Sequence, residues 1–412
     1  MSKSNKIKII LAALIAALLI AAGIFYFAEI KDRIAQPEEN TTEQAAEEAT
    51  EEAGEVKEAE PSDVLFFASD YQSMEGWNAP SDTLRGILGA VTTDGKEITN
   101  VIYCGDYSND AKFHDYQISP DDAINEIREI VASECGGVNQ DSMVFEQGNH
   151  DKLTDAITES GLHEYDNYLV YVLNTEYDFP WKQGRDTEFR DRVISASEEM
   201  ENCFDELIEV GETRPVFIAG HVPLHFTART SSRHDTGDNM YAKYIFDVVN
   251  DAADSLDIIY VHGHNHSKGW DCYMGGSSAF KEAGDTILIP DAGDNTVNTD
   301  DFTVETLKFT YMNAGYTGYY MNCGGAEVSN GTADQYAAAD DTLTGTLCEI
   351  LPDKIVITRY SEEGMHPLSW DGEGNPYKDN IDEGLIDSEY YSVRRESPVE
   401  IIRRRAGEAE TQ

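Results

Sequence analysis

From residue 63 onward, short apolar runs alternate with amphipathic stretches, which is the pattern of a mixed α/β domain. Apolar runs of strand length that end in Gly, Asp or Asn predict β-strands. Stretches with apolar residues every three or four positions predict helices. Strands are expected over residues 64–68, 98–104, 142–146, 168–173, 215–219, 257–261, 286–289, 304–311, 344–351 and 354–360. Helices are expected over 82–91, from 120 onward, over 188–209 and over 241–253.

The first thirty residues follow a different pattern. Residues 9–28 carry no charged side chain and would span about 30 Å as a helix, which is the thickness of a bilayer's hydrocarbon core. Lys3, Lys6 and Lys8 precede this run and favour a cytoplasmic N-terminus. The sequence therefore predicts a single-pass anchor in the cell membrane, with the remaining chain outside the cytoplasm. Cleavage as a signal peptide near residues 21–23 stays open, as does a domain that faces the cytoplasm.

A charged spacer separates this anchor from the α/β pattern. Residues 37–61 contain ten Glu and one Lys without any apolar period, which is typical of a solvated, self-repelling tether. The expected organisation is a cytoplasmic stub and transmembrane helix over 1–30, an acidic linker over 31–61, one folded domain over 62–360 and a C-terminal appendage or tail over 361–412.

Composition restricts the partners. The 412 residues include 78 Asp and Glu against 30 Lys and Arg, for a formal net charge of −48. Such a surplus repels phosphate polyanions, so no nucleic-acid partner is expected and any phosphate chemistry requires a local positive centre. The 6 cysteines form no Cys-x-x-Cys pair, which leaves free thiols and one or two disulfides equally open.

Several predicted strands are followed by Asp, Asn or His. In open α/β sheets, ligands gather outside the carboxyl ends of the strands, so these side chains are expected to converge. Carboxylate, amide and imidazole ligands suit divalent Zn, Mn or Fe, and they outnumber the needs of one tetrahedral site. The sequence therefore predicts two divalent cations that share a carboxylate. The side chains in question are Asp70, Asp106, Asn149, His221, His264 and His266.

Four short motifs carry these residues in a fixed order. They are Gly105-Asp106, Gly148-Asn149-His150-Asp151, Gly220-His221 and Gly263-His264-Asn265-His266. With these motifs the chain resembles the calcineurin-like metallophosphoesterases, a family of dimetal phosphatases, over residues 63–360. The resemblance implies two packed mixed β-sheets flanked by helices, an α/β/β/α architecture. The first motif of the family is usually Asp-x-His, whereas this chain has Asp70-Tyr71-Gln72.

Carried over residue by residue, the resemblance implies two metal sites. The first site would use Asp70, Gln72, Asp106 and His266. The second site would use Asp106 as the bridge, with Asn149, His221 and His264. Because a neutral amide binds more weakly than imidazole, the first cation is expected to be looser, or biased toward Mn or Fe rather than Zn. With glutamine at this position the chain also resembles the manganese-dependent ADP-ribose/CDP-alcohol diphosphatases. This resemblance points toward a substrate with a diphosphate linkage.

The implied function is hydrolysis of a small phosphate ester or diphosphate by in-line attack of a dimetal-bridged hydroxide. His150 would face the substrate as a general acid, and Asp151 would orient its ring. The competing hypothesis is a non-catalytic cell-surface binding or adhesion module, in which the altered first motif leaves one structural metal and no turnover.

Overall fold

The structure is a computed structural model of the whole chain. It describes residues 59–72, 79–108, 118–174, 187–224, 241–264, 280–290, 302–318, 343–363, 392–395 and 398–403. These residues belong to one compact unit, Ala59–Gln412. The expected membrane helix and nearly all of the acidic linker lie outside the described residues. Within the described ranges, no helix is both long enough and apolar enough to cross a bilayer.

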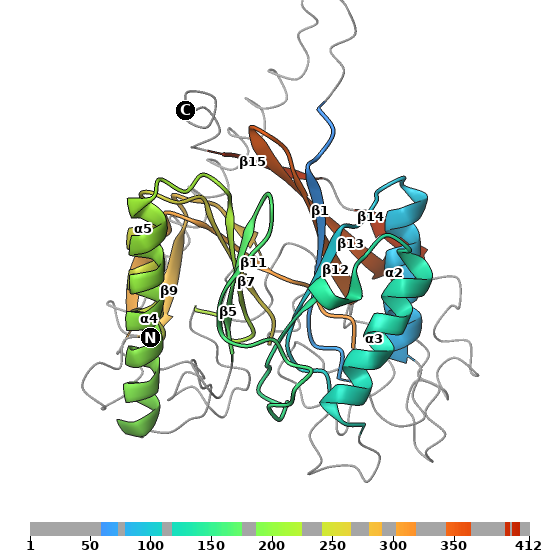
Figure 1. The fold of residues 1–412 in the computed structure, drawn as a ribbon, viewed down its shortest axis with the longest axis horizontal. Coiled ribbons are helices and arrows are strands. Elements are labelled where there is room, and N and C mark those ends of the chain that lie inside the picture. The colour runs from blue at the N-terminus through green and yellow to red at the C-terminus, as the bar shows by residue number, and fades with distance from the viewer. Residues whose placement is uncertain are drawn as a thin grey trace, which may run out of the picture. The chain divides into compact units, whose positions relative to one another are not determined.

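The first large sheet has seven strands and mixes parallel with antiparallel pairs (Figure 1). Its order is β14 (Ser392–Arg395), β13 (Lys354–Glu363), β12 (Leu343–Ile350), β1 (Asp63–Ala68), β2 (Asn100–Cys104) and β3 (Val144–Glu146), with β15 (Val399–Ile402) also beside β13. β1, β2 and β3 run parallel, and the other pairs are antiparallel. The residues that follow β1, β2 and β3 therefore emerge at the same edge of this sheet.

The second large sheet has six strands. Its order is β4 (Gly161–Glu164), β5 (Leu169–Leu173), β6 (Val216–Gly220), β7 (Ile258–His262), β11 (Thr310–Asn313) and β8 (Phe280–Lys281). The four central strands run parallel, and β4 and β8 are antiparallel edges. A separate two-stranded sheet consists of β9 (Thr286–Pro290) and β10 (Phe302–Thr306).

The two large sheets pack face to face, and helices cover their outer faces (Figure 1). α2 (Ala79–Thr93) and α3 (Pro120–Glu134) cover the first sheet, while α4 (Thr187–Glu209) and α5 (Ala242–Ala252) cover the second. Phe67 of β1 and Phe217 of β6 meet between the sheets, with ring centroids 5.3 Å apart. The expected mixed α/β fold with two multi-stranded sheets and helices is therefore confirmed.

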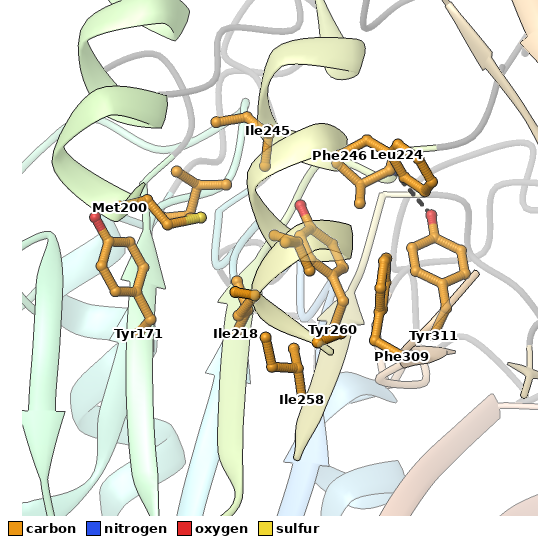
Figure 2. Packing of buried hydrophobic residues seen from close by; sticks show 14 of the residues in the cluster. Tyr171, Met200, Ile218, Leu224, Ile245, Phe246, Ile258, Tyr260, Phe309 and Tyr311 are labelled. Atoms are coloured by element: carbon orange, nitrogen blue, oxygen red, sulfur yellow. Dashed lines mark hydrogen bonds between the residues drawn. The ribbon is translucent and has the colours of Figure 1, made fainter. Parts of the chain in front are cut away.

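Two buried tyrosines of the second sheet anchor the chain just beyond β6. Figure 2 shows Tyr260 and Tyr311 within the apolar cluster that lies beneath α4 and α5. The Tyr260 hydroxyl donates to the carbonyl of Val222 at 3.1 Å, and the Tyr311 hydroxyl accepts from the backbone N–H of Leu224 at 2.9 Å. The packing of this core therefore fixes the segment that carries His221.

Most predicted helices and strands are confirmed, with ends that shift by a few residues. The single strand predicted over 304–311 is wrong, because β10 pairs with β9 whereas β11 pairs with β7. An apolar run cannot reveal that its two halves join different sheets. The short strands β4, β8, β14 and β15 and the 3-10 helix η1 (Gln140–Ser142) were not predicted. β14 and β15 extend the first sheet beyond residue 360, into the segment expected to be an appendage.

The cysteines in the described ranges carry free thiols. They are Cys104, Cys135, Cys203 and Cys348. Cys272 and Cys323 lie outside the described residues.

Candidate metal centre

The structure brings together five of the predicted site residues, from both large sheets. Asp70, Asp106 and Asn149 follow β1, β2 and β3 of the first sheet, while His221 and His264 follow β6 and β7 of the second. The ligand atoms of Asp70, Asp106 and His221 lie within 4.8 Å of one another, and all three side chains are buried. Of the other two predicted ligands of the first site, Gln72 lies beside Asp106, whereas His266 lies outside the described residues.

Four of these side chains form a tighter cluster. Nε2 of His221 lies 3.2 Å from Oδ2 of Asp106 and 3.1 Å from Oδ1 of Asn149. Nδ1 of His264 lies 2.6 Å from the same Asn149 oxygen and 3.3 Å from Nε2 of His221. Ligands about 2.1 Å from a tetrahedral cation would be separated by about 3.4 Å, so this donor set fits a divalent metal ion. It is the set expected for the second cation.

Neighbouring groups orient these ligands. Nδ1 of His221 lies 2.8 Å from the carbonyl oxygen of Cys104, which can only accept a hydrogen bond, so Nδ1 is the donor and Nε2 faces Asp106. Oδ2 of Asp70 accepts from the Ser69 hydroxyl at 2.6 Å and from the His264 backbone N–H at 3.0 Å. The Ser69 hydroxyl also makes a short contact with the carbonyl of Gly315. Such supporting bonds are typical of metal sites, because they hold a ligand in one orientation.

The electrostatics of the cluster favour a cation. Burial by itself lowers the pKa of His221, but the negative charges of Asp106 and Asp70 outweigh burial and raise this pKa to about 10. Burial raises the pKa of Asp106, whereas the attraction of His221 and His150 outweighs it and holds this pKa well below its usual range. A proton on His221 thus balances buried carboxylates, and a divalent cation would displace that proton while supplying more positive charge.

Backbone strain gathers at the same place. Within the described ranges, the non-glycine residues with a left-handed φ are Asp70 (54°), Gln72 (43°), Asp106 (59°) and His264 (66°). Such conformations cost on the order of 1–3 kcal/mol each and persist where surrounding contacts enforce them. Backbone strain of this kind is typical of functional sites.

Gln72 stands where the resemblance leads one to expect histidine, and it points its amide nitrogen at the Asp106 carboxylate. Its side chain is 3% exposed, and Nε2 donates to Oδ2 of Asp106 at 3.3 Å. Oε1 is buried and has no hydrogen-bond partner among the described residues. An amide that donates to Asp106 competes with a cation for that carboxylate. Gln72 would hold the first cation only after its amide rotates so that Oε1 faces the site.

His150 lies at the edge of the cluster and is partly exposed. Its backbone N–H donates to Oδ1 of Asp106 at 2.9 Å, and its ring Nε2 lies 3.9 Å from Oδ2 of the same carboxylate. The Asp151 carboxylate instead accepts backbone N–H groups, including those of Asp106 at 2.7 Å, Tyr107 at 2.9 Å and Gly148 at 2.9 Å. The sequence led us to expect that Asp151 would bind the ring of His150. In the structure its carboxylate binds backbone N–H groups instead. Asp151 is committed to main-chain groups because its side chain turns back toward the end of β2.

Asn174 supports the turn after β3 and was not among the predicted site residues. Its Oδ1 accepts from the backbone N–H of Gln147 at 2.8 Å, and its Nδ2 donates to the carbonyl of Thr158 at 2.9 Å. A signal was present, because Asn174 directly follows the predicted strand that ends at residue 173. It lacked the preceding glycine that marked the strand ends at Asp106, Asn149, His221 and His264.

Comparison with solved structures finds Vps29 from Entamoeba histolytica, in a single-mutant and a double-mutant form. The single mutant is 12% identical and the double mutant 13% identical, and each match covers 82% of this chain and 99% of Vps29. The TM-score is 0.30 in both cases, so neither likeness supports a functional conclusion. Comparisons with known protein families and with curated proteins give no match.

Proposed function

We propose that this chain is a metal-dependent phosphoesterase that hydrolyses a small phosphate ester or diphosphate. The observation that carries the proposal is the cluster of Asp106, Asn149, His221 and His264, whose donor atoms fit a divalent cation. Asp70 lies beside this cluster, with a ligand atom within 4.8 Å of those of Asp106 and His221, and would offer a ligand to the cation of the first site. The order of the motifs, which resembles that of the calcineurin-like metallophosphoesterases, assigns phosphoester chemistry to the cluster.

In the proposed mechanism, some side chains would hold the cations and another would donate a proton. Asp106, Asn149, His221 and His264 would hold one cation, and Asp70, Gln72, Asp106 and His266 would hold the other. Divalent cations at such a site supply an activated water and offset the charge that grows on the phosphoryl group. The partly exposed ring of His150 is placed at the edge of the site, where it would donate a proton to the leaving alkoxide. Because the chain carries a net charge of −48, this site is also what would attract an anionic substrate.

The same proposal places the enzyme at the cell membrane. The uncharged run over residues 9–28 would anchor the chain, and the catalytic domain would lie outside the cytoplasm. Protease treatment of intact cells tests this topology, since an extracytoplasmic domain is degraded while a cytoplasmic one is protected. A small phosphorylated molecule is the proposed substrate, and nucleic acid is not a proposed partner.

Metal removal and a substrate panel test the function. The full-length chain in detergent is stripped with a chelator and then assayed with added Mn²⁺, Zn²⁺ or Fe²⁺ against aryl phosphates, an aryl phosphodiester and nucleotide diphosphate-alcohols. We expect hydrolysis to disappear on stripping and to return with Mn²⁺. Tight binding of one cation without hydrolysis of any substrate would instead support the binding module.

Replacing Gln72 with histidine tests the weaker cation site. Gln72→His removes the amide that donates to Asp106 and supplies an imidazole nitrogen, which binds Zn²⁺ or Mn²⁺ more strongly than a neutral amide does. Histidine also tolerates a left-handed φ better than most residues. We expect the affinity for the cation of the first site, the more weakly bound of the two, to rise by about tenfold in a calorimetric titration, which corresponds to about 1.4 kcal/mol of binding free energy. Gln140→His, at an exposed position of η1, is the control. If Gln72→His leaves the affinity for the cation of the first site unchanged, residue 72 is not a ligand of that cation.

A further inference from the structure

The Asp151 carboxylate is surrounded by backbone N–H groups. Oδ2 accepts from Asp106 at 2.7 Å and from Gly148 at 2.9 Å. Oδ1 accepts from Tyr107 at 2.9 Å and from Ser108 at 3.3 Å. The side chain is nearly fully buried, so these bonds lie out of water and offset part of the cost of burying the carboxylate. One carboxylate therefore binds the main chain of two different turns.

These two turns hold two of the four clustered ligands. The turn after β2 carries Asp106, whose left-handed backbone needs outside support. The turn after β3 carries Asn149, directly after Gly148. A Cβ on Gly148 would overlap the backbone nitrogen and the carboxylate of Asp106, so the two turns touch at this glycine. Asp151 spans the contact, because its Oδ2 binds the N–H groups of both Asp106 and Gly148.

Additional bonds hold Asp151 itself in place. Nε2 of Gln147 donates to the carbonyl of Asp151 at 3.1 Å, and the Asp151 N–H donates to the carbonyl of Gly148 at 3.2 Å. The His150 N–H also connects the two turns, because it donates to Oδ1 of Asp106 at 2.9 Å. A shift of the Asp151 carboxylate would therefore move Asp106 and Asn149 relative to each other.

We propose that Asp151 is a positioning residue of the metal centre, and that its bonds to four backbone amides fix the separation of Asp106 and Asn149 and so the affinity for the cation between them. This inference rests on the proposed metal site. It differs from the role implied by the family resemblance, in which Asp151 acts through the ring of His150. The two roles make opposite predictions for metal binding.

A double-mutant cycle separates the two roles. Asp151→Asn keeps the shape of the side chain but turns an NH₂ group toward backbone donors. It therefore removes some of the four hydrogen bonds that the carboxylate accepts. In the full-length chain in detergent, calorimetric titration with Mn²⁺ should show an affinity lower by roughly 10- to 100-fold, the usual effect of removing a group that supports a metal ligand. His150→Ala should leave this affinity unchanged, and Asp151→Asn should have the same effect in the His150→Ala background. Asp155→Asn, an exposed carboxyl in the same segment, is the matched control.

The opposite pattern would overturn the inference. If Asp151→Asn leaves Mn²⁺ affinity unchanged and lowers turnover only when His150 is present, then Asp151 acts through that ring. If the wild-type chain hydrolyses nothing but Asp151→Asn still weakens Mn²⁺ binding, the phosphoesterase function fails while the positioning role stands.

Hydrogen exchange of the wild-type chain provides a second test if the variant does not fold. The amides of Asp106, Tyr107 and Gly148 should exchange slowly, at least about 100-fold slower than the exposed amides near Asp155, because each is bonded to a buried carboxylate. Mass spectrometry of peptides that cover residues 105–108 and 147–151 measures this protection. Fast exchange in both peptides would show that the bonds do not persist and would exclude the positioning role.

Discussion

Replacing Asp106 with asparagine is expected to lower kcat/KM by about 10³-fold or more. Asp106 is the carboxylate that both proposed cations would share, and its Oδ2 lies 3.2 Å from Nε2 of His221. Asparagine has nearly the same shape but no charge, so it binds a dication far more weakly. Metal-assisted catalysis contributes several kcal/mol of transition-state stabilisation, and about 4 kcal/mol corresponds to 10³-fold in rate. Steady-state kinetics together with Mn²⁺ titration measure the effect.

Asp166→Asn, an exposed change in the loop before β5, is the control for Asp106→Asn. Circular dichroism of both variants confirms that they are folded. Hydrolysis within tenfold of the wild type in a folded Asp106→Asn chain would show that this carboxylate is not a bridging ligand, and the proposed mechanism would fail with it.

Replacing His150 with alanine is expected to lower kcat by about 10²- to 10⁴-fold for substrates with an alkoxide leaving group, because general acid catalysis contributes on that scale. Esters of an acidic phenol need no proton on departure, so they should lose much less. Mn²⁺ affinity should stay the same, since the ring nitrogen lies 3.9 Å from the Asp106 carboxylate and the side chain belongs to neither predicted ligand set. Kinetics with both leaving-group types on the full-length chain measure this difference.

His163→Ala is the matched control, since His163 lies on β4 and its ring contacts the carbonyl of Glu159 instead of any residue of the cluster. Equal losses for alkyl and acidic aryl phosphates in His150→Ala would indicate that His150 binds the phosphoryl group instead of protonating the leaving group. An alanine variant with full activity on alkyl phosphates would exclude His150 from the mechanism.

Local sequence patterns predicted most of the secondary structure because most elements bury one face or one continuous run. β1, β2 and β6 are buried at every position or nearly so, and their apolar runs were recognisable in the sequence. α3 begins as its sequence suggests, with Ser119 accepting the N–H of Asp122 ahead of Pro120. Edge strands are different, because β4 and β15 are only partly buried and their alternation is weak. β15 also pairs with β13, about forty residues earlier in the chain, and a local pattern does not encode such a distant partner.

Some features of the candidate site could likewise be predicted from the local sequence, and others could not. The positions of Asp106, Asn149, His221 and His264 could be predicted, because each is a polar residue directly after a buried strand. The role of Asp151 could not, since neighbouring residues in a turn point in different directions and the next residue along is not a guide to contact. The support from the Cys104 carbonyl was also hidden, because a backbone carbonyl carries no motif. Asn174 was overlooked because no glycine precedes it, although it follows a predicted strand.

By itself, the sequence determined which chemical groups this chain places at its strand ends and that the surrounding domain is a mixed α/β fold. Only the tertiary structure decided how close those groups come, that Gln72 turns its amide nitrogen toward Asp106, and that Asp151 binds main chain instead of a ring. The physical reason is that strand periodicity is a local property, set by burial within a few residues. Distances between side chains depend on how two sheets pack and on strained backbone at Asp70 and Asp106, which long-range contacts impose.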